Sequence, residues 1–271
     1  MSYNRPAAQV PAAPLSSTQI QGRLKPQQKW TARRDHLRPV PARIPLTRRY
    51  EVTWINEAGD IEEQTQIAPA LPLFEDAFAS FTHGTLIQTT RGPVAVEDLM
   101  PGEMLECANG RVAALQWKGA ITIVPGAPTL RPEPPKLYRV TADAFGLGRP
   151  ARDLLLGPAA RRLVKDPNVR AAIGAEAALV PVAAGADGYS IIEVTPVSAT
   201  RVYHLATEGH QTIMAGGVEV ETYHPGQELT LSLSEDLRQT YLQLFPHILS
   251  LGGFGRVLYP RLSTEDMRDL F

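Results

Sequence analysis

The sequence predicts a mainly β protein, and two observations carry that prediction. Between residue 80 and about residue 226, short apolar segments of strand length follow one another and are separated by Gly and Pro. Helical periodicity is scarce in this region, where the Ala-rich segment Ala171–Leu179 is the one internal helix we expect. Because 44% of the 271 residues are hydrophobic, such segments can fill a buried core. An all-β domain over residues 80–226 is therefore predicted.

Two different segments precede this domain. Residues 1–45 are rich in Pro, Gln, Arg and Ala and follow neither a helical nor a strand period, so we expect a disordered tail. Residues 46–79 are predicted as a β-hairpin arm and linker. Apolar residues alternate with others from Tyr50 to Ile55, the turn is Asn56–Asp60, and a short helical turn is expected over Phe74–Phe81.

Within and after the domain, each element has its own sequence signal. Residues 227–271 are predicted to be a small helical appendage, because Ser234 and Ser263 each begin a cap-like segment followed by helical spacing. The segments predicted as strands are Thr85–Thr89, Val94–Val96, Met104–Cys107, Val112–Lys118, Ile121–Val124, Leu137–Thr141, Asp153–Leu156, Arg161–Val164, Ile191–Thr195, Arg201–Ala206, Gln211–Ala215 and Val218–Tyr223.

Basic residues are concentrated in the tail. Residues 1–49 hold ten of the 27 Lys and Arg and one of the 28 Asp and Glu, which leaves seventeen basic and twenty-seven acidic residues in the remainder. The two parts therefore carry about +9 and about −10. A basic tail of this kind folds back on its own acidic body, or contacts nucleic acid, an anionic surface or a protein partner. The sequence does not identify that partner.

Composition also argues against several classes of protein. The single cysteine, Cys107, cannot form an internal disulfide and is expected to be a small core residue. Met1–Leu15 is broken by prolines and is not typical of a cleavable signal peptide, and the apolar stretch Ala171–Ala186 is too short to span a bilayer. We expect a cytoplasmic protein, or one exported without such a signal. No metal-ligand spacing or nucleotide-binding motif occurs, so no cofactor or metal is expected.

A family resemblance begins at residue 80. Ser80–Ile87, which reads Ser-Phe-Thr-His-Gly-Thr-Leu-Ile, is followed by Gly92–Leu99 and the turn Pro101–Gly102. In this order the segments resemble the opening of a bacterial Hint domain, the autoprocessing module of hedgehog proteins and inteins. The resemblance implies a Hint-like β-horseshoe. It extends over more than half of the chain through Gln116–Gly119, Ala144–Pro150, Arg152–Leu155 and His204–Tyr223.

The resemblance implies a reaction as well as a fold. Hint autoprocessing begins when a Cys or Ser attacks the carbonyl of the preceding residue and converts the amide into a thioester or ester. Ser80, after Ala79, stands at the nucleophile position. The family's assisting histidine lies in a Ser-Pro-x-His-Arg segment, and the matching run Gly157–Arg161 places Ala160 at that position. An alanine has no group that transfers a proton.

Other histidines remain as candidates for that role. Ser80, His210 and His83 are the candidate catalytic residues, and His204 is a further histidine that can approach the same centre. Splicing also requires an Asn at the C-terminal junction, where this chain has Tyr223–Gly226 followed by Gln227. Intein-type splicing is therefore not expected. Hedgehog-type release would need only Ser80 and would separate residues 1–79 from the rest.

Three functional hypotheses follow. The leading one is a Hint domain without efficient autoprocessing that acts as a scaffold or interaction module. The second, from the enzyme class, is slow autocatalytic cleavage at Ala79–Ser80 by an N–O acyl shift without splicing. The third is binding of nucleic acid or an anionic surface by the tail, based on Arg33, Arg34, Arg48 and Arg49.

Overall fold

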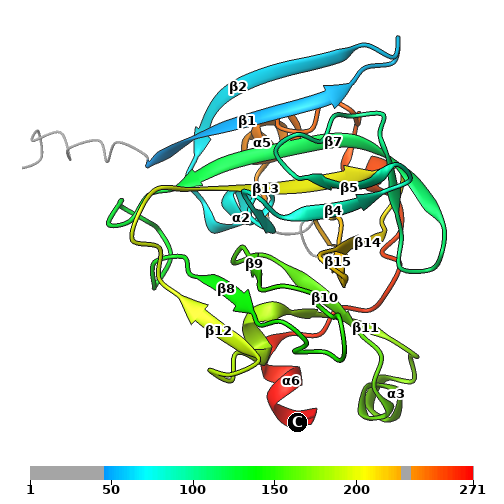
Figure 1. Ribbon diagram of the computed structural model, residues 1–271. Helices are drawn as coiled ribbons and strands as arrows, with labels where there is room; N and C mark the ends of the chain where they lie inside the picture. Colours follow the sequence, from blue (N-terminus) through cyan, green and yellow to red (C-terminus); the bar gives the residue numbers. More distant parts are fainter. Residues whose placement is uncertain (1–45, 227–232, 271) are drawn as a thin grey trace, which may run out of the picture. The chain divides into compact units, whose positions relative to one another are not determined.

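The computed structural model describes residues 46–226 and 233–270 (Figure 1). The tail predicted for residues 1–45 lies outside the described residues. Within them, fifteen strands form one sheet: twelve follow one another in a continuous path of pairings, and β1, β2 and β5 pair at its side. The named strands all pair antiparallel. The mainly β prediction is therefore confirmed. None of the helices in the described part of the chain is long and apolar enough to cross a membrane.

The elements are short, as the frequent Gly and Pro residues predict. The helices are α2 (Pro72–Asp76), α3 (Pro167–Ile173), α5 (Glu235–Leu242) and α6 (Thr264–Leu270), with single 3₁₀ turns η1 (Val182–Gly185) and η2 (Leu251–Phe254). The strands are β1 (Thr47–Ile55), β2 (Ile61–Pro69), β3 (Phe81–Thr82), β4 (Leu86–Thr89), β5 (Gly92–Ala95), β6 (Met104–Glu106), β7 (Val112–Ile123), β8 (Leu137–Val140), β9 (Leu154–Leu156), β10 (Arg161–Val164), β11 (Ala178–Pro181), β12 (Ile191–Val194), β13 (Thr200–Thr207), β14 (Thr212–Ala215) and β15 (Val218–Glu221).

Two long strands, β7 and β13, organise the sheet. They pair from Thr200 opposite Ile123 to Thr207 opposite Leu115, and a bulge interrupts the register after Ala206. The predicted hairpin is confirmed as β1 and β2, and β1 pairs in turn with β7 (Figure 1). On its other side, β13 pairs with β3, and this short strand leads on to β9, β8 and β12. The arrangement places the start of β3, just after Ser80, at the middle of the sheet.

An aromatic cluster fixes the C-terminal segment to these strands. The ring of Trp117 on β7 lies 4.7 Å from that of Phe245 and 5.2 Å from that of Phe78, and Phe245 stacks on Tyr223 at 5.1 Å. The Trp117 indole N–H also donates a hydrogen bond to the Leu244 carbonyl, at 2.9 Å. The predicted helical appendage is therefore packed into the core, where burial of aromatic rings is a large stabilising contribution.

Two expected elements differ from the structure. The helix predicted at Ala171–Leu179 is wrong: α3 ends at Ile173, and β11 already occupies Ala178–Pro181. The reason is local, because Asp166 caps the helix by accepting a hydrogen bond from Asn168 N–H, and Gly174 ends it with a left-handed φ of 69°. The short helical turn expected at Phe74–Phe81 is also displaced, because α2 begins at Pro72.

The break predicted between Lys118 and Ile121 is wrong as well, because β7 runs through it without interruption. Gly119, which follows the predicted end of the strand at Lys118, lies within β7, opposite Val52 of β1 and His204 of β13. A Cβ at this position would lie 2.2 Å from the Trp117 ring and 2.5 Å from the Phe78 ring. Gly119 is therefore required by packing rather than by a turn.

We expect Gly119→Ala to destabilise the protein by about 2 kcal/mol, because the added methyl group overpacks the contact between two core rings. Denaturant unfolding followed by Trp fluorescence measures this change. Gly252→Ala is the matched control, since its Cβ would meet only Ser250 Oγ at 3.6 Å. Equal stability of the two variants would contradict the packing role of Gly119.

Candidate functional site

The Ala79–Ser80 peptide is held between β13 and the turn after β9. Ser80 N–H donates to the Tyr203 carbonyl at 2.9 Å, and the Ser80 carbonyl accepts from Gly157 N–H at 2.7 Å. The Ala79 carbonyl accepts from Ala159 N–H at 2.9 Å. A Cβ on Gly157 would lie 2.3 Å from the Ala79 oxygen, so only glycine permits this close approach. Three backbone hydrogen bonds thus hold the two residues of the candidate scissile bond.

The Ser80 side chain is buried and unpaired. Ser80 is 0% exposed, and its Oγ has no hydrogen-bond partner among the described residues. A buried hydroxyl without a partner is costly and uncommon. Ala160, the residue at the position of the assisting histidine, is 1% exposed and packs in the same core cluster as Phe81 and Val182. Its methyl group supplies no proton acceptor.

His204 on β13 is the buried histidine beside this peptide, since it follows the Tyr203 carbonyl that binds Ser80. Its ring lies 5.1 Å from the Tyr223 ring and 6.1 Å from the Phe81 ring, and neither ring nitrogen has a partner of good hydrogen-bond geometry. Burial lowers the pKa of His204 to about 4, although the carboxylate and backbone of Glu221 weakly favour the charged form. The ring is therefore neutral at pH 7 and can accept a proton.

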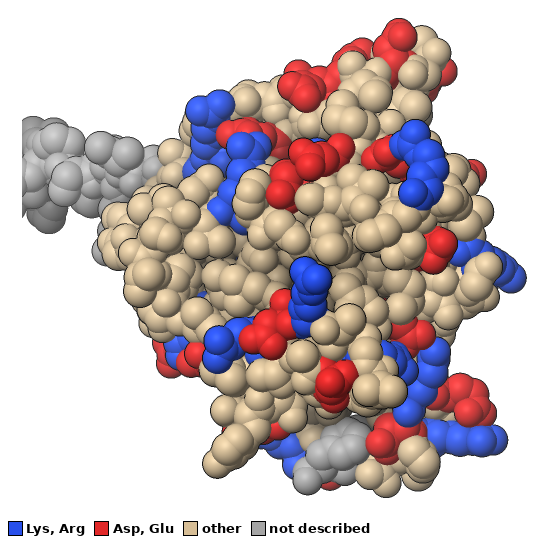
Figure 2. Space-filling view, viewed as in Figure 1, with Lys and Arg blue, Asp and Glu red and all other residues tan. Residues whose placement is uncertain are grey.

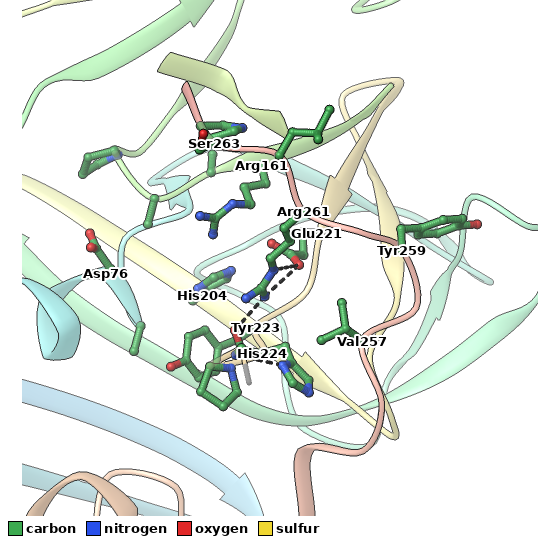
Figure 3. A pocket seen from close by; sticks show the side chains of 18 of the residues that line it. Asp76, Arg161, His204, Glu221, Tyr223, His224, Val257, Tyr259, Arg261 and Ser263 are labelled. Carbon is green, nitrogen blue, oxygen red and sulfur yellow. Dashed lines mark hydrogen bonds and ion pairs between the residues drawn. The ribbon is translucent and has the colours of Figure 1, made fainter. Parts of the chain in front are cut away.

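A cavity of about 860 Å³ opens next to His204 (Figure 3). Its lining comes from α2, the turn after β9, β10, the end of β15 and residues 257–266, which lie far apart in the sequence. Among the described residues, no group of three or more His, Cys, Asp or Glu side chains is arranged to hold a metal ion.

The family model described as Hint domain matches residues 79–227, which is more than half of the chain. The chain belongs to the Hint domain family. A mutant of the Ssp DnaB mini-intein is a similar solved structure, at 13% identity and a TM-score of 0.30, with 53% of this chain and 90% of that chain covered. No curated protein matches the sequence.

In this Hint domain, His210 belongs to a buried polar network. Leu258 N–H donates to His210 Nδ1 at 2.9 Å, so Nε2 carries the proton and donates to Glu221 Oε1 at 2.8 Å. Arg261 also donates to that oxygen at 2.8 Å. Burial raises the pKa of Glu221, but the His210 hydrogen bond and the Arg261 charge outweigh it, and the net pKa is below the usual value. Both ring nitrogens of His210 thus take part in hydrogen bonds, one with Leu258 N–H and one with Glu221.

His83 lies in a different environment. Its side chain is 64% exposed and its Nε2 lies 3.4 Å from Glu97 Oε1, while Glu97 also accepts from Gly84 N–H. Neither His83 nor His210 makes a hydrogen bond to Ser80 Oγ in the described part of the chain. The Hint fold thus places the three candidate catalytic residues, Ser80, His83 and His210, in separate sets of contacts.

Sequence reasoning missed the charged residues of the cavity wall. Glu221 ends the strand β15, whose four residues Val-Glu-Val-Glu are all buried, and a buried acid needs a partner that neutralises it. Arg261 supplies part of that partnership from forty residues away, and no local pattern indicates such a pair. Arg161 was assigned only as the first residue of a strand, although it also lines the cavity.

We expect the stability of this Hint domain to fall as the pH decreases from 6.5 to 4. The unfolded chain binds a proton on His204 near pH 6.5, whereas the folded chain does so only near pH 4, so the folded state loses up to about 3 kcal/mol across this window. Above pH 6.5 His204 is neutral in both the folded and the unfolded chain, so it does not change the stability with pH. His247 has a similarly lowered pKa of about 4 and adds to the slope.

Urea unfolding at several pH values measures this dependence. His204→Phe keeps an aromatic ring in the same site and should flatten part of the slope, while His83→Phe, at an exposed position, should leave it unchanged. An unchanged slope in His204→Phe would show that His204 is not buried in its neutral form.

Proposed function

We propose that this Hint domain does not process itself efficiently and acts as an intact interaction module. One observation carries the proposal: the Ser80 hydroxyl is enclosed and has no proton acceptor in contact with it. Nucleophilic attack by serine requires a base that removes the hydroxyl proton, and general-base assistance is worth about 10²- to 10⁴-fold in rate. Ala160 offers none, and the core around Ser80 leaves no surface to water.

We expect purified protein to keep one intact mass over days, because the proton of Ser80 has no acceptor. The measurement is denaturing mass spectrometry with and without hydroxylamine, which cleaves an ester at Ala79–Ser80 if one forms. Ser80→Ala is the control for unrelated hydrolysis. Fragments of residues 1–79 and 80–271 that are absent from Ser80→Ala would overturn the proposal.

We also expect Ser80→Cys combined with Ala160→His to cleave after Ala79 in the presence of a thiol. Ala160 borders the cavity, and an imidazole there would stand at the position of the family's assisting histidine, while a thiol is the stronger nucleophile. Mass spectrometry compares the double variant with Ser80→Cys alone and with Ser80→Cys combined with Ala159→His, which puts an imidazole one residue away. Equal rates in all three would show that the missing histidine is not what limits the reaction.

A second candidate is slow cleavage at Ala79–Ser80, and the neutral ring of His204 supports it. The ring lacks hydrogen-bond partners and follows the residue whose carbonyl binds Ser80 N–H. The hydrogen bond from Ala159 N–H polarises the Ala79 carbonyl in the sense needed for attack. On this account, both Ser80→Ala and His204→Phe abolish slow fragment formation. Cleavage that persists in His204→Phe would exclude the histidine.

Tail-mediated binding has less support. Arg33 and Arg34 lie outside the described residues, whereas Arg48 is paired with Glu75 at 2.7 Å and Arg49 lies 3.3 Å from Glu51. On the face shown in Figure 2, basic and acidic side chains are interspersed. Affinity for nucleic acid that falls steeply with salt remains the test of this candidate.

A further inference from the structure

Three arginines line the cavity beside His204, and two of them are neutralised. Arg131 donates to Glu75 at 3.2 Å and to Asp76 at 2.6 Å. Arg261 pairs with Glu221 at 2.8 Å and donates to the His224 carbonyl at 2.7 Å. Asp76 and Glu221, two of the acids that line the cavity, are thus already paired with cations from the protein.

Arg161 differs from both. Among the described residues it forms no ion pair within 4.0 Å, and its buried Nε has no hydrogen-bond partner. Asp76 and Glu221 interact with it only at longer range. Figure 3 shows the Arg161 guanidinium directed into the space between Asp76 and His204. A partly buried guanidinium with open donors leaves one positive charge to be satisfied.

His204 is a second unpartnered group on the same wall. It is 5% exposed, and among the described residues neither ring nitrogen makes a hydrogen bond of good geometry, although backbone groups of Ala77 and Glu221 lie near enough to favour its charged form. The neutral imidazole has one N–H donor and one acceptor. Two unsatisfied polar groups from different strands, β10 and β13, therefore border the same cavity. This is the pattern of a binding site with few, convergent polar groups.

The rest of the lining is largely apolar, and it includes Pro158, Pro181, Pro225, Val257, Leu258 and Pro260. A ligand that fits this lining has an apolar body. The volume of about 860 Å³ lies in the range of small-molecule sites. Within the described part of the chain, Arg161 is the lining arginine without an ion pair, and the lining acids Asp76, Glu221 and Asp266 repel a second negative charge, which favours a monoanion over a phosphate dianion. The planar guanidinium fork matches a carboxylate.

We propose that the cavity between α2, β10, β13 and residues 257–266 binds a small organic carboxylate, with its two oxygens toward Arg161 and His204 and its apolar body along the proline-rich wall. This goes beyond the proposed function, because it does not depend on whether the Ala79–Ser80 bond is cleaved. The carboxylate completes the hydrogen bonds of both groups, which the protein alone leaves open.

Isothermal titration calorimetry of the full chain with benzoate and hexanoate tests the site, and benzamide and hexanamide are the uncharged counterparts. We expect the acids to bind at least ten-fold more tightly than the amides, because a hydrogen bond to a charged group is lost in the amides. Arg161→Gln should weaken acid binding at least ten-fold, and Arg161→Lys should retain part of it. Arg162→Gln is the matched control, since Arg162 borders a different cavity and lies over the Phe145 ring.

Several outcomes would overturn the proposal. They are equal affinity for acids and amides, equal loss in Arg161→Gln and Arg162→Gln, or no heat from either acid at millimolar concentration. Tighter binding of inorganic phosphate would contradict the monoanion assignment. If only a short peptide with a free C-terminal carboxylate bound, the small-molecule assignment would be wrong. Should Arg161→Gln fail to fold by thermal melting, Arg161→Lys and the acid–amide comparison still decide.

Discussion

The hydrogen bond from the Trp117 indole to the Leu244 carbonyl, inside a cluster of aromatic rings, is the contact on which the rest of the structure depends. It joins the longest strand to the C-terminal segment. Through stacking on Phe245 it also fixes Tyr223, whose ring packs against His204. On this wall of the cavity His204 is therefore positioned by a core contact, which restricts the orientations of its side chain.

Glycine serves close packing at two positions of this protein. The Trp117 and Phe78 rings occupy the place that a Cβ at Gly119 would take, and the Ala79 carbonyl occupies the place that a Cβ at Gly157 would take. At both positions the fold brings backbone against its neighbours more closely than any side chain allows. The second contact also holds the Ala79–Ser80 peptide in place, while among the described residues Ser80 Oγ has no hydrogen-bond partner.

Local signals predicted much of the fold. The β1–β2 hairpin follows from alternation around Tyr50 and Val52, and the start of α5 follows from Ser234, whose side chain accepts from Leu237 N–H. The assignment of Ser80 to the nucleophile position rests on the local order of motifs and stays a prediction. The network of Glu221 and Arg261 was not predicted, because tertiary pairing leaves no periodic trace. The end of the strand at Lys118 was predicted wrongly, because a glycine can stand either in a turn or in a crowded strand.

The segment before Ser80 is part of the folded body. β1 pairs with β7 from Glu51 to Trp54, and Phe74 and Phe78 lie in the same core cluster as Trp117 and Phe245. Breaking the bond after Ala79 would therefore not set the N-terminal piece free. The result would be a nicked protein whose two chains stay associated through sheet and core, so that in this molecule cutting the backbone and releasing a product are distinct events.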